Sequence, residues 1–174
     1  MKISRRKLKQ LVLSALILLS CGALAQEKGA YGPKELTART GSAVKTVQGE
    51  SAVTIDQPSA YDFTHAIFSL KNVAREDTLE LSVRASLAEG CRTGKIGAIL
   101  FIRKDKKWVR LGAMFWNKTL TEKYTDIKIR KKFSQLGAEA KAGRYMLLIY
   151  KMRNTEGAAV SKVEWLVEKS SEQK

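Results

Sequence analysis

The sequence predicts an all-β protein, an antiparallel β-sandwich of the jelly-roll type with about eight strands. Apolar and polar side chains alternate through much of the region from residue 50 to residue 168, which is the period of strands with one buried face. Only residues 133–141 have a composition that suits a helix, and Gly137 limits that segment to a short turn. Many short strands with almost no helix are typical of two packed antiparallel sheets.

The predicted strands differ in how many faces they bury. The alternation is cleanest over residues 78–87, where every second residue is apolar. Residues 96–102 are continuously apolar, which predicts a central strand covered on both faces. The basic segment 103–107 separates them from a strand over 108–116, so the two are expected to form a hairpin. Further strands are expected at residues 52–55, 66–73, 125–130, 145–152 and 160–168.

The first 25 residues have the three parts of a cleavable signal peptide. Five cations without an acid precede an apolar run over residues 11–19. That run is too short for a permanent membrane helix, which needs about 20 apolar residues. Ala23-Leu24-Ala25 offers small residues at both positions that a signal peptidase accommodates, so cleavage is expected before Gln26. The sequence therefore predicts a periplasmic or secreted protein.

Two other interpretations of this segment stay open. Leu18-Leu19-Ser20-Cys21-Gly22 resembles the lipobox of bacterial lipoproteins, in which the cysteine is lipidated and anchors the protein to a membrane. Leu19 departs from that pattern, because its position usually carries a smaller residue. Ser4-Arg5-Arg6-Lys7-Leu8-Lys9 resembles part of a twin-arginine export signal. The sequence favours the ordinary secretory route and leaves open whether Cys21 is removed or lipidated.

Removal of residues 1–25 leaves 149 residues, the size of one domain. Residues 26–42 are rich in glycine and charged side chains without periodicity, which predicts a flexible arm; residues 43–168 are expected to form the sandwich and residues 169–174 a polar tail. The remaining chain has 27 Lys or Arg against 17 Asp or Glu, a formal charge of +10. Outside the cytoplasm this charge favours an anionic envelope component as partner over nucleic acid.

One part of the sequence resembles a known class of domain. Residues 141–149, Lys-Ala-Gly-Arg-Tyr-Met-Leu-Leu-Ile, and then Val163-Glu164-Trp165-Leu166-Val167 are similar to the closing strands of galactose-binding-like jelly rolls of the carbohydrate-binding-module type. Those domains often bring a glycine-tyrosine turn into the penultimate strand and end with an alternating one. The resemblance covers about a third of the predicted mature chain, and it implies a fold without implying a ligand.

No catalytic constellation can be assembled from the sequence, so we expect a protein that is not an enzyme. His65 is the only histidine, and no G-x-S-x-G motif occurs. Phe63 and Ile67 share the parity of His65, which predicts a hydrogen-bonded histidine near the start of a strand.

The sequence also provides no usual transition-metal site. The predicted mature chain has one histidine and one cysteine, Cys91, which cannot supply a zinc ligand set. Arg92 beside Cys91 suggests a thiol that is more acidic than usual, although an inert thiol is the favoured alternative. No cofactor is expected. A structural calcium ion, held by carbonyls and acids such as Asp56, Asp62 and Glu164, stays an alternative.

Aromatic side chains are the best candidates for ligand contact, because an exposed ring stacks on the apolar face of a sugar. Trp108 and Trp116 lie on the parity opposite the apolar residues of strand 108–116, so both face outward if that apolar set faces the core. Tyr61 and Tyr124 lie in expected loops and would join them. The alternative is that both faces are covered and the tryptophans belong to the core, as is expected for Trp165.

Two basic clusters are candidate anion-binding residues. If the fold brings them together they make an anion-attracting patch, and otherwise they are solvated turns and strand ends. The first cluster comprises Arg103, Lys104, Lys106 and Lys107, and the second comprises Lys128, Arg130, Lys131 and Lys132.

The predicted function is that of an exported, non-catalytic binding module for carbohydrate or another anionic envelope ligand. The alternative is an envelope structural or assembly factor, including a lipoprotein, that docks on a membrane surface or a protein partner through its basic loops. The sequence does not specify the ligand, the oligomeric state or the order of the strands.

Overall fold

A computed structural model describes residues 26–38, 43–56, 63–137 and 140–170. The expected signal peptide with Cys21, the candidate residues Tyr61 and Asp62, and the last four residues of the polar tail lie outside the described residues. Within the described ranges, no helix is long and apolar enough to span a membrane.

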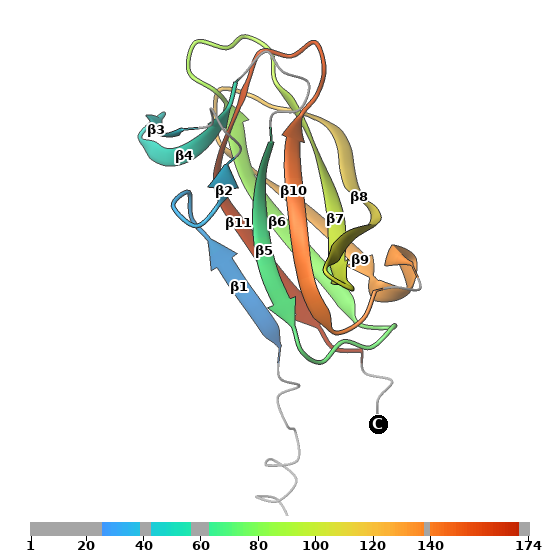
Figure 1. The fold of residues 1–174 in the computed structure, drawn as a ribbon. Helices are drawn as coiled ribbons and strands as arrows, with labels where there is room; N and C mark the ends of the chain where they lie inside the picture. Colours follow the sequence, from blue (N-terminus) through green and yellow to red (C-terminus); the bar gives the residue numbers. More distant parts are fainter. Residues whose placement is uncertain (1–25, 39–42, 57–62, 138–139, 171–174) are drawn as a thin grey trace, which may run out of the picture.

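Two antiparallel sheets form a sandwich, so the predicted fold class is confirmed (Figure 1). The six-stranded sheet has the order β3 (Val44–Val47), β4 (Glu50–Ile55), β11 (Ala158–Glu168), β6 (Thr78–Leu87) and β9 (Thr125–Lys132), with β1 (Glu27–Tyr31) also paired to β11. The five-stranded sheet has the order β2 (Thr37–Ala38), β5 (Phe63–Leu70), β10 (Gly143–Lys151), β7 (Lys95–Lys104) and β8 (Lys107–Thr119). Figure 1 shows β5, β10 and β7 in front of β11 and β6.

The N-terminal segment is more ordered than the sequence predicts. Residues 26–42 were expected to be a flexible arm, but β1 pairs with β11 from Glu27↔Val167 to Tyr31↔Val163. The Tyr31 hydroxyl donates a hydrogen bond to the Ile67 carbonyl at 2.8 Å, which joins β1 to the opposite sheet. The prediction of an arm is therefore wrong for β1. Strands β1, β2 and β3 account for the excess over the expected eight.

The core fills the space between the sheets with one parity of each strand. Six inward residues of β6 and β10 are at most 1% exposed: Leu79, Leu81, Val83, Tyr145, Leu147 and Ile149. Trp165 packs against this core as predicted, with its ring stacked on Phe68 at 5.2 Å. In the described ranges the one helical turn is η1 (Phe133–Leu136), a 3-10 helix within the segment expected to turn.

The glycine-tyrosine turn at the start of β10 is a structural element. Tyr145 is fully buried, and its hydroxyl donates a hydrogen bond to the Lys141 carbonyl at 2.5 Å. Burial raises the pKa of Tyr145 to about 12, although the hydrogen bond opposes this effect. The phenol thus ties the turn before β10 to the core.

Candidate functional site

The outer faces of the two sheets have opposite character. The six-stranded sheet carries charged side chains that neutralise one another in pairs, as expected for a face in contact with water. These ion pairs join Arg84 to Glu50 and Asp126, Arg130 to Glu80 and Glu168, and Lys162 to Glu164. The outer face of the five-stranded sheet instead carries mainly apolar and aromatic side chains.

We call this second surface the aromatic face. Its positions alternate with buried ones, so β5, β10 and β7 are apolar on both sides. The strand register places its residues in rows: Tyr150 lies between Phe63 and Gly97, Leu148 between His65 and Ile99, and Met146 between Ile67 and Phe101. The apolar members are Phe63, Ile67, Ile99, Phe101, Trp108, Trp116, Met146, Leu148 and Tyr150. Trp116 is 53% exposed and the others are half-buried.

A β-bulge lies at Trp116 on the outer side of the five-stranded sheet. The register passes from Ile96↔Lys118 to Ala98↔Phe115, so Trp116 and Asn117 together lie opposite the single residue Gly97. Asn117 has φ 51, a left-handed conformation that asparagine tolerates better than most residues. Trp116 directly follows the buried Phe115, so it points outward by the ordinary alternation of a strand, and the bulge places Asn117 beside it opposite the same glycine.

Trp116 and Tyr150 form an aromatic platform above Gly97. Their ring centroids are 6.0 Å apart and the rings meet edge to face at 75°. A Cβ at Gly97 would lie only 2.5 Å from the Tyr150 hydroxyl oxygen, so the tyrosine lies flat on this glycine. Burial raises the pKa of Tyr150, and its hydroxyl has no hydrogen-bond partner among the described residues.

Both tryptophans of the aromatic face lie against arginines. The Arg110 guanidinium carbon is 5.9 Å from the centre of the Trp116 ring, and that of Arg103 is 5.4 Å from the Trp108 ring. These distances are those of cation–π contacts. Each tryptophan of β8 therefore lies against one arginine, Trp116 against Arg110 of β8 and Trp108 against Arg103 of β7. Eight residues at about 3.3 Å each place the two tryptophans at most roughly 25 Å apart.

A polar hollow of about 570 Å³ adjoins the aromatic platform. Tyr150 and Asn117 form part of its wall, and the loop between β10 and β11 forms another part. The other lining residues are Thr93, Lys95, Lys151, Met152, Arg153, Asn154 and Thr155. Amide, hydroxyl and cationic groups thus lie next to the exposed Trp116 ring and the half-buried Tyr150 ring, which is the combination that sugar hydroxyls and sugar-ring faces require.

Hydrogen bonds fix the loops around this hollow. The Glu156 carboxylate accepts hydrogen bonds from the backbone amides of Arg92 and Thr93, and its own amide donates to the Thr93 carbonyl at 2.9 Å. The buried Lys151 ammonium donates to the Thr155 carbonyl at 2.9 Å. The rim is therefore pre-formed, which lowers the ordering cost of binding.

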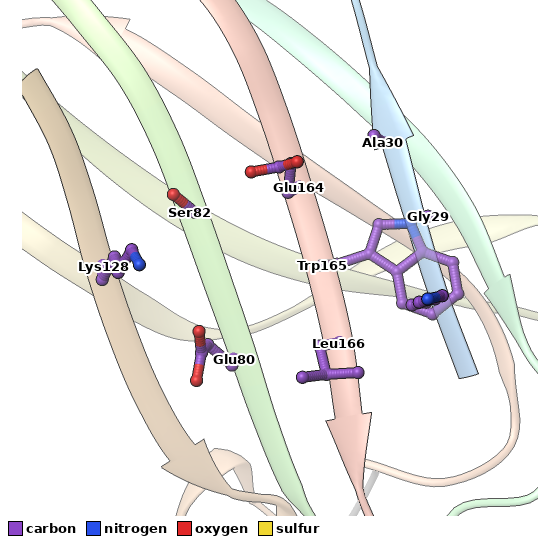
Figure 2. Close-up of a pocket in the computed structure, with 9 residues that line it drawn as sticks. Gly29, Ala30, Glu80, Ser82, Lys128, Glu164, Trp165 and Leu166 are labelled. Atoms are coloured by element: carbon purple, nitrogen blue, oxygen red, sulfur yellow. The ribbon is translucent and has the colours of Figure 1, made fainter. Parts of the chain in front are cut away.

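A second depression lies on the outer face of the six-stranded sheet (Figure 2). It measures about 540 Å³ and is lined by charged side chains of both signs, including Lys28, Glu80, Lys128 and Glu164. Figure 2 shows the Trp165 ring lying over β1 near Gly29, away from the carboxylates. Among the described residues that line it, Trp165 is the one with an aromatic ring, and this ring already stacks on Phe68.

The structure places the predicted ligand-binding residues on different surfaces. Trp108 and Trp116 both lie on the aromatic face, whereas Tyr61 lies outside the described residues. Tyr124 does not join the tryptophans, because it packs against Val47, Ala52 and Ala159 on the six-stranded sheet, beneath Arg84. The expected grouping of Tyr124 with the tryptophans is therefore wrong.

The two basic clusters also lie on different sheets. Arg103, Lys104, Lys106 and Lys107 are exposed at the turn between β7 and β8. In the second cluster, Arg130 and Lys132 form ion pairs with acids, and the Lys131 ammonium donates to the Ala113 carbonyl at 2.7 Å. Lys128 lines the depression of Figure 2. Anion binding by either cluster stays a prediction.

The structure contradicts the predictions for His65 and Cys91. His65 lies on the aromatic face, burial lowers its pKa, and its Nδ1 has no hydrogen-bond partner among the described residues. The prediction of a hydrogen-bonded histidine is wrong for that atom. Burial, followed by the charges of Glu156 and Asp56, raises the pKa of Cys91, so the suggested acidic thiol is also wrong.

The described acids do not gather into a metal site. No group of three or more His, Cys, Asp or Glu side chains in the described ranges is placed to hold an ion. Of the acids named as alternative calcium ligands, Asp56 pairs with Lys45 at 3.3 Å and Glu164 pairs with Lys162 at 2.6 Å.

Several residues of the site were not identified from the sequence. Tyr150, Gly97 and Asn117 belong to predicted strands or their edges, and nothing marked them as surface residues. One signal was present: in strand 145–152 both parities are apolar, which predicts either two covered faces or an exposed apolar one. The structure shows the second case for Met146, Leu148 and Tyr150.

Comparisons with known proteins support the fold. No family model matches the sequence, and no curated protein matches it. The structure is similar to the CBM22-1 xylan-binding domain from Paenibacillus barcinonensis Xyn10C, with a TM-score of 0.58 and 13% identity over 83% of this chain and 95% of that domain.

Two further solved structures show the same similarity. The C-terminal family 22 carbohydrate-binding module of Clostridium thermocellum Xyn10B has a TM-score of 0.53 and 13% identity, covering 76% of this chain and 86% of that one. A Podospora anserina GH26-CBM35 β-(1,4)-mannanase has a TM-score of 0.52 and 14% identity, over 82% of this chain and 28% of that one. The resemblance inferred from the closing strands is thus confirmed, and the chain has the β-sandwich fold of carbohydrate-binding modules.

Proposed function

We propose that this protein is an exported, non-catalytic carbohydrate-binding module and that the aromatic face is its binding surface. One observation carries the proposal: Trp116 is 53% exposed at a bulge, edge-on to Tyr150, beside a pre-formed polar hollow. An indole ring exposed to water is stabilised when a ligand covers it, so an exposed tryptophan marks a binding site. Sugar rings have flat apolar faces that can cover an indole in this way.

The proposal includes a non-catalytic role. Several of the similar solved structures, including the CBM22-1 domain, are described as xylan-binding domains, which supports binding without turnover. The N-terminal cations and apolar run support export to the periplasm or beyond, where polysaccharides are accessible. Mass spectrometry of the native protein tests the export step: a mature chain that begins at Gln26 is expected, and a chain that retains residues 1–25 would contradict it.

Affinity electrophoresis tests the binding function. The purified protein is run through native gels that contain xylan, mannan, mixed-linkage glucan, polygalacturonate or alginate, and retardation in at least one gel is expected. Trp116→Ala should abolish that retardation, because it removes the most exposed ring of the platform. Val44→Ser is the matched control, since Val44 is 49% exposed on β3 of the other sheet. Equal retardation of the two variants would reject the aromatic face as the binding surface.

The turn between β7 and β8 supports a second candidate function, docking on an anionic membrane surface. Arg103, Lys104, Lys106 and Lys107 are exposed there, within a chain whose formal charge is +10 once residues 1–25 are removed. Sedimentation with vesicles containing phosphatidylglycerol tests this function. Docking predicts binding that fades as salt rises and that Lys106→Gln with Lys107→Gln weakens. Binding that is unchanged in this variant would reject it.

A further inference from the structure

The charges of the two sheets are distributed unequally. The six strands of the charged sheet contain eight Lys or Arg residues and six Asp or Glu residues. The five strands of the other sheet also contain eight Lys or Arg residues but no Asp or Glu. The aromatic face therefore has no carboxylate within its own strands that can neutralise a cation.

Three arginines stand on this face. Arg103 pairs with Trp108 across the β7–β8 register, Arg110 pairs with Phe101, and Arg144 pairs with Ser69. None of the three forms an ion pair with an acid in the described part of the chain. Both described arginines on the strands of the other sheet, Arg84 and Arg130, do so.

The arrangement also brings like charges together. Tyr145 of β10 is opposite Ile102 of β7 in an antiparallel pair. One residue further along this register, Arg144 of β10 and Arg103 of β7 therefore face each other on the outer side of the sheet. Like charges placed across neighbouring strands destabilise a sheet by a few tenths of a kcal/mol or more. A bound anion would remove this repulsion, and a guanidinium matches carboxylate, sulfate or phosphate oxygens in a two-pronged hydrogen bond.

We infer that the ligand of the aromatic face is an acidic polysaccharide. Its sugar rings stack on Trp116 and Trp108, and its anionic groups lie against Arg110, Arg103 and Arg144. This inference rests on the proposed carbohydrate-binding function and specifies the chemical class of the ligand. The Trp116–Arg110 pair of β8 and the Trp108–Arg103 pair across β8 and β7 make two such subsites, so a chain long enough to span both binds more tightly than a short fragment.

Pairs of polysaccharides that differ only in charge separate the effect of the anionic group on affinity from the effect of the sugar chain. Isothermal titration calorimetry uses polygalacturonate, alginate and hyaluronan, each compared with its carboxyl-reduced form, in which only the carboxylate is replaced. Chondroitin and chondroitin sulfate distinguish carboxylate from sulfate as the anionic group. The expected result is at least tenfold tighter binding of one acidic polymer than of its carboxyl-reduced form, with an affinity that falls as salt rises.

Charge-matched variants then assign the effect to the arginines. Replacing Arg103, Arg110 and Arg144 by glutamine should weaken binding of the acidic polymer at least tenfold. The control replaces Lys34, Lys123 and Lys162 by glutamine, which removes the same charge outside the aromatic face and should change affinity less than twofold. Arginine-to-lysine replacement keeps the charge and loses the planar fork, so it should give an intermediate loss. Circular dichroism confirms that each variant is folded.

The outcomes distinguish this inference from the proposed function. Equal binding of acidic and carboxyl-reduced polymers that depends on Trp116 would overturn the inference and leave carbohydrate binding intact. If affinity falls equally in the variant with the three arginines replaced by glutamine and in the control with the three lysines replaced by glutamine, the inference would be overturned, because net charge alone would explain binding. Tighter binding of a single-stranded oligothymidylate than of every polysaccharide would overturn both proposals, since stacking and arginine contacts would then serve nucleic acid.

Discussion

Gly97→Ala is the sharpest perturbation of the aromatic platform, because it adds one methyl group directly beneath Tyr150. The new Cβ would lie 2.5 Å from the Tyr150 hydroxyl oxygen and 2.6 Å from its Cζ. Ordinary contacts begin at 3.4 Å, so the end of the ring must retreat by about 0.8–0.9 Å.

The expected effects on stability and on binding differ. The displaced atoms form the far end of a side chain on an outer face, and the required rotation is far below the ~30° that costs about 0.5–1.5 kcal/mol. The free energy of unfolding should therefore fall by no more than about 1.5 kcal/mol, which includes a weakened edge-to-face contact between Tyr150 and Trp116. Without that contact Trp116 is no longer held in one orientation, and fixing it on a ligand costs up to about the same energy, so affinity should fall by about two- to tenfold.

Gly143→Ala is the matched control, since its Cβ would meet nothing closer than Ile102 at 3.5 Å. Urea unfolding gives the stability of both variants, and calorimetry with the polysaccharide found by affinity electrophoresis gives the affinity. Unchanged affinity in a folded Gly97→Ala protein would refute the assigned role of the platform. A loss of several kcal/mol of stability would refute the claim that the Tyr150 ring can shift at little energetic cost.

Three further predictions concern stability, and urea unfolding measures each of them. Asn117→Val should cost about 1–3 kcal/mol because a β-branched residue is strained at φ 51, whereas Asn117→Gly should be nearly neutral; equal effects would contradict a left-handed bulge residue. Tyr145→Phe should cost about 1 kcal/mol by removing the hydrogen bond to the Lys141 carbonyl, and a neutral result would mean that this bond adds nothing. Burial alone would raise the pKa of Asp77, but hydrogen bonds from the Ala74 and Ser170 amides and from Lys169 hold it below its ordinary value. Because folding lowers that pKa, ionised Asp77 stabilises the protein above about pH 4, and this contribution is lost as the pH falls further. The wild type should therefore lose more stability between pH 6 and pH 3 than Asp77→Asn does. Equal losses would contradict this prediction.

The sequence predicted the features that depend on local alternation. Residues 78–87 alternate between apolar and polar and form β6, and the continuously apolar residues 96–102 form β7. The prediction that 96–102 is covered on both faces is wrong, because Ile99 and Phe101 lie half-buried on the aromatic face. β1 was missed because Glu27–Tyr31 contains a glycine and no large apolar alternation. Gly29 is needed there for a tertiary reason, since a Cβ would lie 2.7 Å from the Trp165 indole nitrogen.

The site was predicted only in part, for reasons of long-range geometry. Trp108 and Trp116 were identified from parity, but three register shifts in β8 decide how each side chain is aimed. Tyr150 was missed because an exposed apolar parity looks the same in sequence as a buried one. The environment of Cys91 was misjudged because Arg92 is its neighbour in the chain, whereas Glu156 and Asp56 are the charges that raise its pKa.

Oxidation of tryptophan by N-bromosuccinimide, read out by peptide mass spectrometry, tests most directly whether the aromatic face holds the ligand. In the free protein, Trp116 should be oxidised first because it is 53% exposed, and Trp165 last because its ring is stacked on Phe68. A saturating amount of the polysaccharide identified by affinity electrophoresis should protect Trp116 and leave the rate at Trp165 unchanged. Oxidation of Trp116 at the same rate with the polysaccharide bound would place binding elsewhere on the molecule.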